Sequence, residues 1–233
     1  MKKIIYSFAC SVFFLLVSNV NASVIMTGTR IVFPSVSTEK IIQFKNPDSQ
    51  PYVIQLQLTT ADNTPDPSAP FVLVPPVFRM EPHTGQSVRL IANGTGRLPE
   101  NKESVFYLNF TQLPALKATE QNRLVIAVTS RVKIFYRPDS LKGQVTDAYQ
   151  SVNFSLNNGI LTVHNPTGFY ISIRKALLKI GNESVVISES DMLSPQSTVQ
   201  WRVPAKIKTL KDALLEMTMV NDYGTDYTKE RYL

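Results

Sequence analysis

The stretch that decides the fold is residues 122–138, NRLVIAVTSRVKIFYRP, because it is the longest strand-like run in the chain. Successive side chains of a β-strand point to opposite faces, so this stretch has two rows. One row consists of Leu124, Ile126, Val128, Ser130, Val132 and Ile134. The other row begins apolar and ends with two cations: Val125, Ala127, Thr129, Arg131 and Lys133.

The first half of this stretch is apolar on both faces. A strand of an antiparallel sandwich normally alternates apolar with polar residues, because one face packs on the core and the other meets water. Two interpretations are open. The strand is buried on both faces, or the row of Leu124, Ile126 and Val128 is left bare and offered to another protein.

The chain on both sides of this stretch reads as a succession of strands. We expect strands at 24–33, 40–45, 52–59, 71–74, 86–92 and 104–113, and later at 151–156, 160–164, 170–180, 184–187, 198–203 and 214–220. Asn-Pro, Pro-Pro and Asn-Gly pairs between them are typical of turns. Seven strands within the first half of the chain is the density of an immunoglobulin-like sandwich.

The length of 233 residues suits two domains of about 100 residues each. We predict an N-terminal immunoglobulin-like domain at 23–138, a linker at 139–148 and a C-terminal immunoglobulin-like domain at 149–233. An internal repeat supports two related domains, since QFKNPDSQPYVIQLQL and TVHNPTGFYISIRKAL both run strand, Asn-Pro turn, aromatic residue, strand. The predicted fold is all-β, with two sandwiches forming an angled pair around a cleft.

The first residues predict a secretory signal peptide. Lys2 and Lys3 precede an apolar run, and small Ala22 closes the segment, so cleavage is expected after residue 22. An uncleaved membrane anchor is the alternative, but an apolar core of about 14 residues is shorter than the roughly 20 needed to span a bilayer. Cleavage also removes Cys10, the only cysteine, so no disulfide is expected.

Composition and motifs argue against an enzyme. A formal net charge of +6 without a basic block does not favour nucleic acid as a partner. The two histidines, His83 and His164, are isolated, so no metal site is expected. Nucleophile-elbow, phosphate-loop and dinucleotide motifs are absent from the sequence. We therefore expect no cofactor and no small-molecule substrate.

Two cations stand out within strand-like runs: Arg30 in the first predicted strand and Lys133 near the end of 122–138. Each alone is explained by a side chain that reaches water at a sheet edge. Cations in such runs otherwise require an anionic partner. Together with the bare apolar row, they predict a site that grips a carboxylate and pairs a chain along Leu124, Ile126 and Val128.

Six motifs, in this order and spacing, carry a family resemblance: TGTRIVFP, PPVFRMEP, QSVRLIAN, ESVFYLNF, RVKIFYRP and VNDYGT. Through them the whole predicted mature chain resembles the periplasmic pilus chaperones of the chaperone-usher pathway. The resemblance implies a boomerang of two immunoglobulin-like domains in the periplasm. It also implies binding of newly secreted pilus subunits, delivery of these to an outer-membrane usher, and no enzymatic activity.

The resemblance assigns roles to particular residues. Arg30 and Lys133 fall on the positions that bind the subunit's C-terminal carboxylate. The donor strand falls on Leu124, Ile126 and Val128, which leaves Val125 on the opposite row as an expected core residue. The links between the domains fall on Glu103, Arg137 and Asp222.

One departure and one subdivision accompany the resemblance. A Trp often present soon after the aromatic position of Tyr52 is absent here, which leaves the detail of that strand open. Only eight residues separate Leu113 from Asn122, which resembles the short-loop branch of the family. A second function class stays open, a secreted immunoglobulin-like adhesin or binding module, although loops such as ADNTPDPSAP carry few aromatics.

Overall fold

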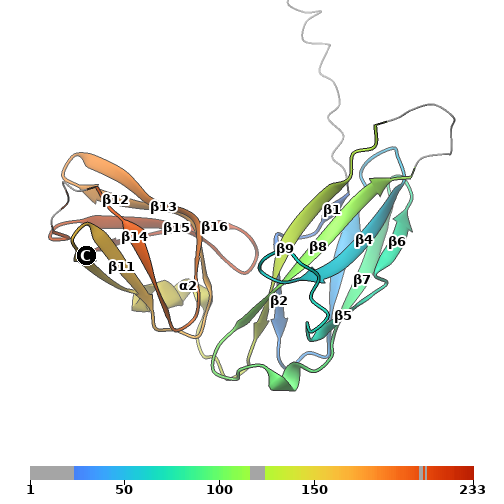
Figure 1. Ribbon diagram of the computed structural model, residues 1–233, viewed down its shortest axis with the longest axis horizontal. Coiled ribbons are helices and arrows are strands. Elements are labelled where there is room, and N and C mark those ends of the chain that lie inside the picture. The colour runs from blue at the N-terminus through green and yellow to red at the C-terminus, as the bar shows by residue number, and fades with distance from the viewer. Residues whose placement is uncertain (1–23, 116–123, 205–206, 208) are drawn as a thin grey trace, which may run out of the picture.

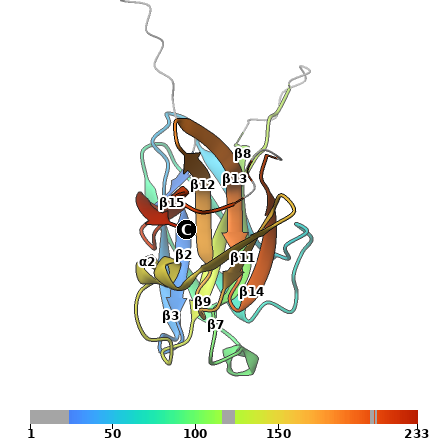
Figure 2. The ribbon, with the colours of Figure 1, turned by 90° about the vertical axis from the view of Figure 1, so that its left-hand side faces the viewer.

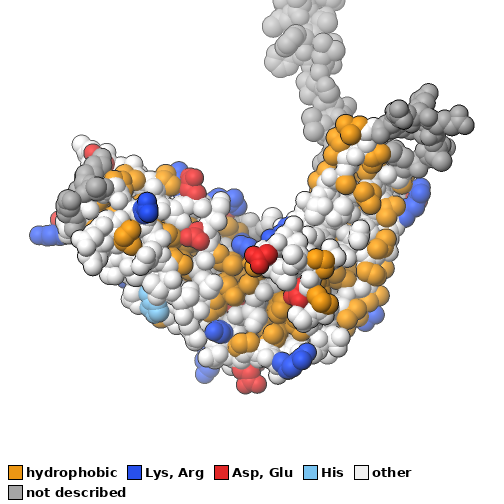
Figure 3. Space-filling view, in the orientation of Figure 1, with side chains coloured by type: hydrophobic (Ala, Val, Ile, Leu, Met, Phe, Trp, Pro, Cys, Tyr) orange, Lys and Arg blue, Asp and Glu red, His pale blue; other side chains and the backbone are white. Residues whose placement is uncertain are grey.

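The structure, a computed structural model, describes residues 24–115, 124–204, 207 and 209–233. Two β-sandwich lobes meet at an angle (Figure 1), and the space-filling view shows a hollow between them (Figure 3). The predicted all-β fold with two sandwich domains is confirmed. The predicted signal peptide, residues 1–22, lies outside the described residues.

The first domain packs a four-stranded sheet, of order β1-β3-β7-β5, on a five-stranded sheet, of order β2-β9-β8-β4-β6. Its core is rich in aromatic side chains, with Phe33 and Phe44 among those almost fully buried between the sheets. Its elements are β1 (Ile25–Met26), β2 (Arg30–Pro34), β3 (Glu39–Lys45), β4 (Tyr52–Thr59), β5 (Phe71–Val74), β6 (Val77–Met80), β7 (Gly85–Ala92), η1 (Thr95–Arg97), β8 (Ser104–Pro114) and β9 (Val128–Arg137).

The strand predicted at 24–33 is two strands in different sheets. The chain bends at Gly28, whose φ of 86° lies in the left-handed region that glycine adopts readily. Before the bend β1 pairs with β3, and after it β2 pairs with β9 in parallel, with Arg30 opposite Lys133. As a result β2 covers β9 only from Lys133 onward. Within the described part of the chain, residues 128–132 of β9 have no partner strand on that side, and we call this the free edge.

The second domain packs a three-stranded sheet, of order β10-β11-β14, on a four-stranded sheet, of order β13-β12-β15-β16. Figure 2 views the molecule from the side of this domain. Its elements are α2 (Val145–Ala148), η2 (Tyr149–Ser151), β10 (Asn153–Asn157), β11 (Ile160–Asn165), β12 (Ile171–Ile180), β13 (Glu183–Leu193), β14 (Ser197–Arg202), β15 (Leu214–Val220) and β16 (Asp226–Tyr232). In the described ranges, no helix has the length and apolar character needed to cross a membrane.

The strands β6 and β16 and the helices η1, α2 and η2 were not expected from the sequence. The strands β6 and β16 lie at sheet edges, where strands are often short or highly charged and carry a weak apolar pattern. The last part of the predicted linker forms α2, and its Val145 and Ala148 are buried in the second core. The domain boundaries predicted from the sequence stay a prediction.

The two Asn-Pro turns of the predicted repeat have the same hydrogen-bond pattern. Asn46 is fully buried, and its amide donates to the carbonyl oxygens of Gln50 at 2.8 Å and Glu81 at 3.0 Å. Asn165 is equally buried and donates to those of Phe169 at 2.8 Å and Ser194 at 2.9 Å. Each amide ties its own turn to a second segment of its domain, so the repeat in sequence is also a repeat in structure.

Candidate functional site

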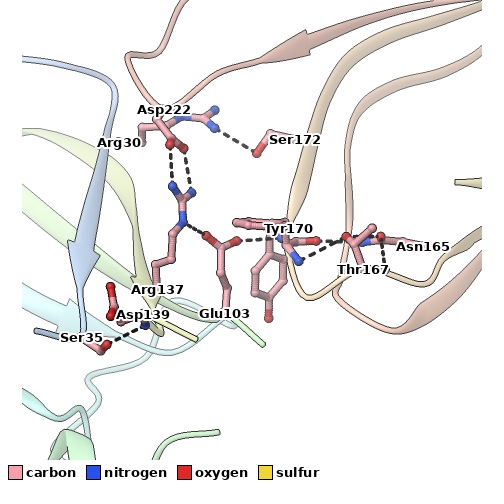
Figure 4. Close-up of polar contacts among 11 residues, drawn as sticks. Arg30, Ser35, Glu103, Arg137, Asp139, Asn165, Thr167, Tyr170, Ser172 and Asp222 are labelled. Atoms are coloured by element: carbon pink, nitrogen blue, oxygen red, sulfur yellow. Dashed lines mark hydrogen bonds and ion pairs between the residues drawn. The ribbon is translucent and has the colours of Figure 1, made fainter. Parts of the chain in front are cut away.

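Arg30 and Lys133 lie side by side where the free edge begins. They are register partners on neighbouring parallel strands, so their side chains leave the same face of the sheet. The Arg30 guanidinium reaches the second domain, where Nη1 donates to the carbonyl oxygen of Val220 at 3.0 Å. The same atom donates to Ser172 Oγ at 3.4 Å, a contact that Figure 4 shows. The Arg30 Nε is buried and has no acceptor among the described residues. The site is therefore built from both domains and retains donor capacity.

The site is positive and incompletely compensated. Burial lowers the pKa of Lys133, and the neighbouring charges of Arg30 and Arg131 lower it further. Burial also lowers the pKa of Arg30, against the opposing charge of Asp222. Among the described residues, neither Arg30 nor Lys133 forms an ion pair. An added carboxylate would therefore relieve unfavourable electrostatics that the free protein carries.

The apolar row next to the free edge is exposed. Leu124 is 88% exposed, Ile126 65% and Val128 45%, whereas Ile134, farther along the same row, is fully buried. Hydrophobic side chains gather at this end of the first domain in Figure 3. These fractions contradict burial on both faces. The expectation that Val125 is a core residue was wrong, because it is 48% exposed and lies ahead of β9, which begins at Val128.

A second cluster of charges joins the two domains. Arg137 donates from Nε to Glu103 Oε1 at 2.6 Å, and from Nη1 and Nη2 to the two carboxylate oxygens of Asp222 at 2.6 and 2.8 Å. Glu103 in turn accepts a hydrogen bond from the backbone N–H of Tyr170 at 2.8 Å. Figure 4 shows this chain of contacts crossing from the first domain to the second. The structure thus brings Glu103, Arg137 and Asp222 together around one guanidinium.

The charges of this cluster depend on one another. Burial raises the pKa of Glu103, and the adjacent Arg137 opposes that rise. Burial acts to lower the pKa of Arg137, but the hydrogen bonds to Asp222 and the charge of Glu103 outweigh it and raise the pKa. Removing Arg137 would leave the buried Glu103 carboxylate without its counter-ion, and removing either carboxylate would leave the Arg137 guanidinium with one partner in place of two.

Two glycines allow the domains to approach closely. A Cβ on Gly168 would lie 2.5 Å from Leu141 Cδ2 and 2.8 Å from the carbonyl oxygen of Asn101. A Cβ on Gly224 would lie 2.2 Å from Thr29 Oγ1, beside Arg30. The cluster around Arg137 and these two contacts together fix how the domains sit at the base of the hollow.

The sequence did not indicate a role for three residues near the site. Ser172 accepts from Arg30, and Arg131 stacks on Tyr107 with its guanidinium carbon 3.9 Å from the ring centre. The sequence places Arg131 on the same row as Lys133, and this was the one sign that it lies near the site. Its hydrogen-bond acceptor Ala61 lies in a loop 70 residues away in sequence. Within the described residues, no group of three or more His, Cys, Asp or Glu could hold a metal ion.

Comparison with known families places the chain in a class. The model described as "Pili and flagellar-assembly chaperone, PapD N-terminal domain" matches residues 23–142, and "Pili assembly chaperone PapD, C-terminal domain" matches residues 147–231. The chain therefore belongs to the pilus-assembly chaperone family, whose members are chaperones and not enzymes. This membership confirms the resemblance seen in the sequence and decides against the adhesin alternative.

Particular relatives agree. The chain is 35% identical over 192 residues to the chaperone protein FimB/FhaD of Bordetella pertussis, covering 78% of each chain. It is 32% identical to the chaperone protein HifB of Haemophilus influenzae, covering 90% of this chain and 88% of the relative. The crystal structure of the YadV chaperone superposes with a TM-score of 0.78 at 28% identity, covering 91% of this chain and all of that one. Family membership supports a periplasmic location.

Proposed function

We propose that this protein is a periplasmic chaperone that binds pilus subunits by donating part of its own β-structure to them. In this proposal Arg30 and Lys133 anchor the subunit's C-terminal carboxylate, and Leu124, Ile126 and Val128 fill an apolar groove of the subunit. The observation that carries the proposal is the free edge of β9. One end of this free edge lies beside Arg30 and Lys133, and the other end adjoins the exposed apolar row.

The geometry supports one direction for the proposed bound strand. The free edge lies on the same side of β9 as β2, and β9 runs from Val128 toward Lys133. A chain that ends at the two cations and lies along this edge must run toward Lys133, parallel to β9. Its backbone would then complete the hydrogen bonds that β9 leaves unpaired there, which is strand addition to a sheet edge.

Apolar burial and the carboxylate would supply separate parts of the binding free energy. Burying each of the three exposed side chains would contribute roughly 1.5 to 3 kcal/mol before ordering costs are subtracted. The carboxylate adds charge-assisted hydrogen bonds from Arg30 and Lys133. It also sets the register, because a slip of one residue would turn the bound strand's apolar side chains away from this row.

Two substitutions on one row test the proposal. Ile126→Asp should leave the free protein folded, because this side chain is 65% exposed, yet abolish binding, because a carboxylate would be buried without a partner. Ile134→Asp is the matched control and should unfold the first domain, since Ile134 is fully buried. Circular dichroism would report folding, and co-purification with a pilus subunit would report binding. Normal subunit capture by folded Ile126→Asp would refute the donated-strand proposal.

The anchor has its own test. Arg30→Ala and Lys133→Ala should remain folded but bind a subunit roughly ten- to hundredfold more weakly, as expected for loss of a charge-assisted hydrogen bond. Wild-type affinity in either soluble variant would count against the anchor.

Delivery of bound subunits to an outer-membrane usher is proposed from family membership alone. Its test is a pull-down in which an immobilised usher is offered the chaperone–subunit complex and the free chaperone. Retention of neither species would contradict this step.

A further inference from the structure

The cleft-facing row of β9 offers two cationic positions, not one. Arg131 lies two residues before Lys133, so both side chains leave the same face of the strand. A slip of the bound strand by two residues, about 6.6 Å, would keep its apolar side chains on the correct face. It would also place the carboxylate beside Arg131. The apolar row alone therefore does not choose between these two registers.

Arg131 points away from the free edge. Its guanidinium lies 3.9 Å from the centre of the Tyr107 ring, and its Nη2 donates to the carbonyl oxygen of Ala61 at 2.9 Å and to that of Thr60. Tyr107 belongs to β8, and the two carbonyls follow β4. In the order β2-β9-β8-β4 these partners lie on the side of β9 opposite the free edge. The Arg131 side chain therefore extends across β8, and its guanidinium lies away from the edge where a bound strand would pair.

The loop that receives Arg131 is itself held in place. Asn109, the register partner of Arg131 on β8, donates from Nδ2 to Asn63 Oδ1 at 2.8 Å. The backbone N–H of Thr60 donates to the carbonyl oxygen of Thr64 at 2.8 Å, and the hydroxyls of the same two residues are also 2.8 Å apart. The acceptors for Arg131 are therefore in position before any partner binds.

We propose that Tyr107 and the carbonyls of residues 60 and 61 hold Arg131 off the free edge, and so restrict a bound carboxylate to Arg30 and Lys133. Arg131 is on this account a positioning residue, which fixes one register because its guanidinium is kept out of hydrogen-bond reach of the bound chain. The inference rests on the proposed function, since it requires a strand bound along β9.

The test releases Arg131 in a protein that lacks the normal anchor. The probe is a short synthetic peptide of alternating Val and Thr, with a lysine at its start for solubility, made with a free C-terminal carboxylate or a carboxamide. Lys133→Ala should bind the carboxylate peptide roughly ten- to hundredfold more weakly than the wild type. Two release variants are made from Lys133→Ala: one adds Tyr107→Leu, and the other shortens the loop 60–64. Each should bind the carboxylate peptide about tenfold more tightly than Lys133→Ala alone, because Arg131 becomes available to the carboxylate.

A second measurement reads the register directly. The only cysteine, Cys10, lies in the predicted signal peptide, so Thr129→Cys gives the mature chain a single thiol. Peptides with a cysteine at successive positions are tested for disulfide formation with it. In the release variants the preferred position should move two residues closer to the peptide's carboxylate, relative to the protein with Lys133. Adding Arg131→Ala should abolish both the regained affinity and the shift.

The outcomes separate this inference from the proposed function. No regained binding in either release variant, each shown to be folded by circular dichroism, would overturn the role of Arg131. Regained binding that survives Arg131→Ala would overturn it as well. Equal binding of the carboxylate and carboxamide peptides by the wild type would instead refute the carboxylate anchor, and the register argument with it.

Discussion

Replacing Asp222 with Ala should loosen the contact between the two domains. The substitution removes both acceptors of the Arg137 Nη atoms, at 2.6 and 2.8 Å, and leaves the guanidinium with Glu103 alone. Breaking a fully buried pair costs about 3 to 5 kcal/mol. The Asp222 side chain is 33% exposed, so water would compensate part of that loss, and we expect about 2 kcal/mol. For a chain of this length that corresponds to a fall in Tm of roughly 4 to 8 °C.

The measurement is differential scanning calorimetry of the wild type, Asp222→Ala and a control on the next strand. Asp226→Ala is the matched control, because it removes a carboxylate four residues away that pairs with Arg174 while both side chains are well exposed, at 43% and 58%. An exposed pair of this kind contributes about 0 to 1 kcal/mol. Equal melting temperatures for Asp222→Ala and Asp226→Ala would refute the reasoning.

Two further predictions concern the close contact between the domains at Gly168 and the carboxylate anchor. Gly168→Ala should destabilise the protein by about 1 to 3 kcal/mol, since its Cβ would lie 2.8 Å from the carbonyl oxygen of Asn101, whereas Gly96→Ala, with nothing within 4 Å, should melt like the wild type. Equal melting of both variants would contradict the close contact. Burial lowers the pKa of Lys133 in the free protein, and a bound carboxylate would raise it again. Affinity for a carboxylate peptide should therefore be full below the pKa of the free protein and should be lost as the pH rises through the higher pKa of the bound state. Lys133→Arg should keep its affinity across the pH range in which the wild type loses it, because a guanidinium stays protonated there, and titration calorimetry at a series of pH values would detect the difference.

The sequence was most informative where each strand carries its own apolar alternation. The strand predicted at 52–59 is β4, and 104–113 differs from β8 by one residue. The break at Gly28 was missed, because both halves of that segment are apolar and only their pairing partners separate them. The edge strand β16, DYTKERY, has charged residues where an apolar row would have marked it.

The candidate site was predictable in part. The alternation of the apolar row could be read directly from the sequence because its residues are close together in the chain, although Leu124 and Ile126 lie ahead of β9, which begins at Val128. The partners of Arg137 lie 34 and 85 residues away in the chain, and only the family resemblance pointed to them. The contacts of Arg131 with residues 60 and 61 could not be inferred at all, because they depend on how the loop after β4 folds across β8.

One alternating row, which begins ahead of β9 and continues along it, contributes both to the core and to the proposed binding surface, and this explains how the protein can expose part of it. Ile134 is fully buried and packs with the first core, while Ile126, eight residues earlier on the same row, is 65% exposed. Stability is therefore provided by the part of the row that the opposite sheet covers. The uncovered part makes little contribution to folding, so its side chains are free to match the groove of a partner. The same exposure carries a risk of aggregation, because a bare apolar strand edge can pair with any other chain. Holding Arg131 away and placing two cations at one end would limit productive pairing to strands that end in a carboxylate at that point.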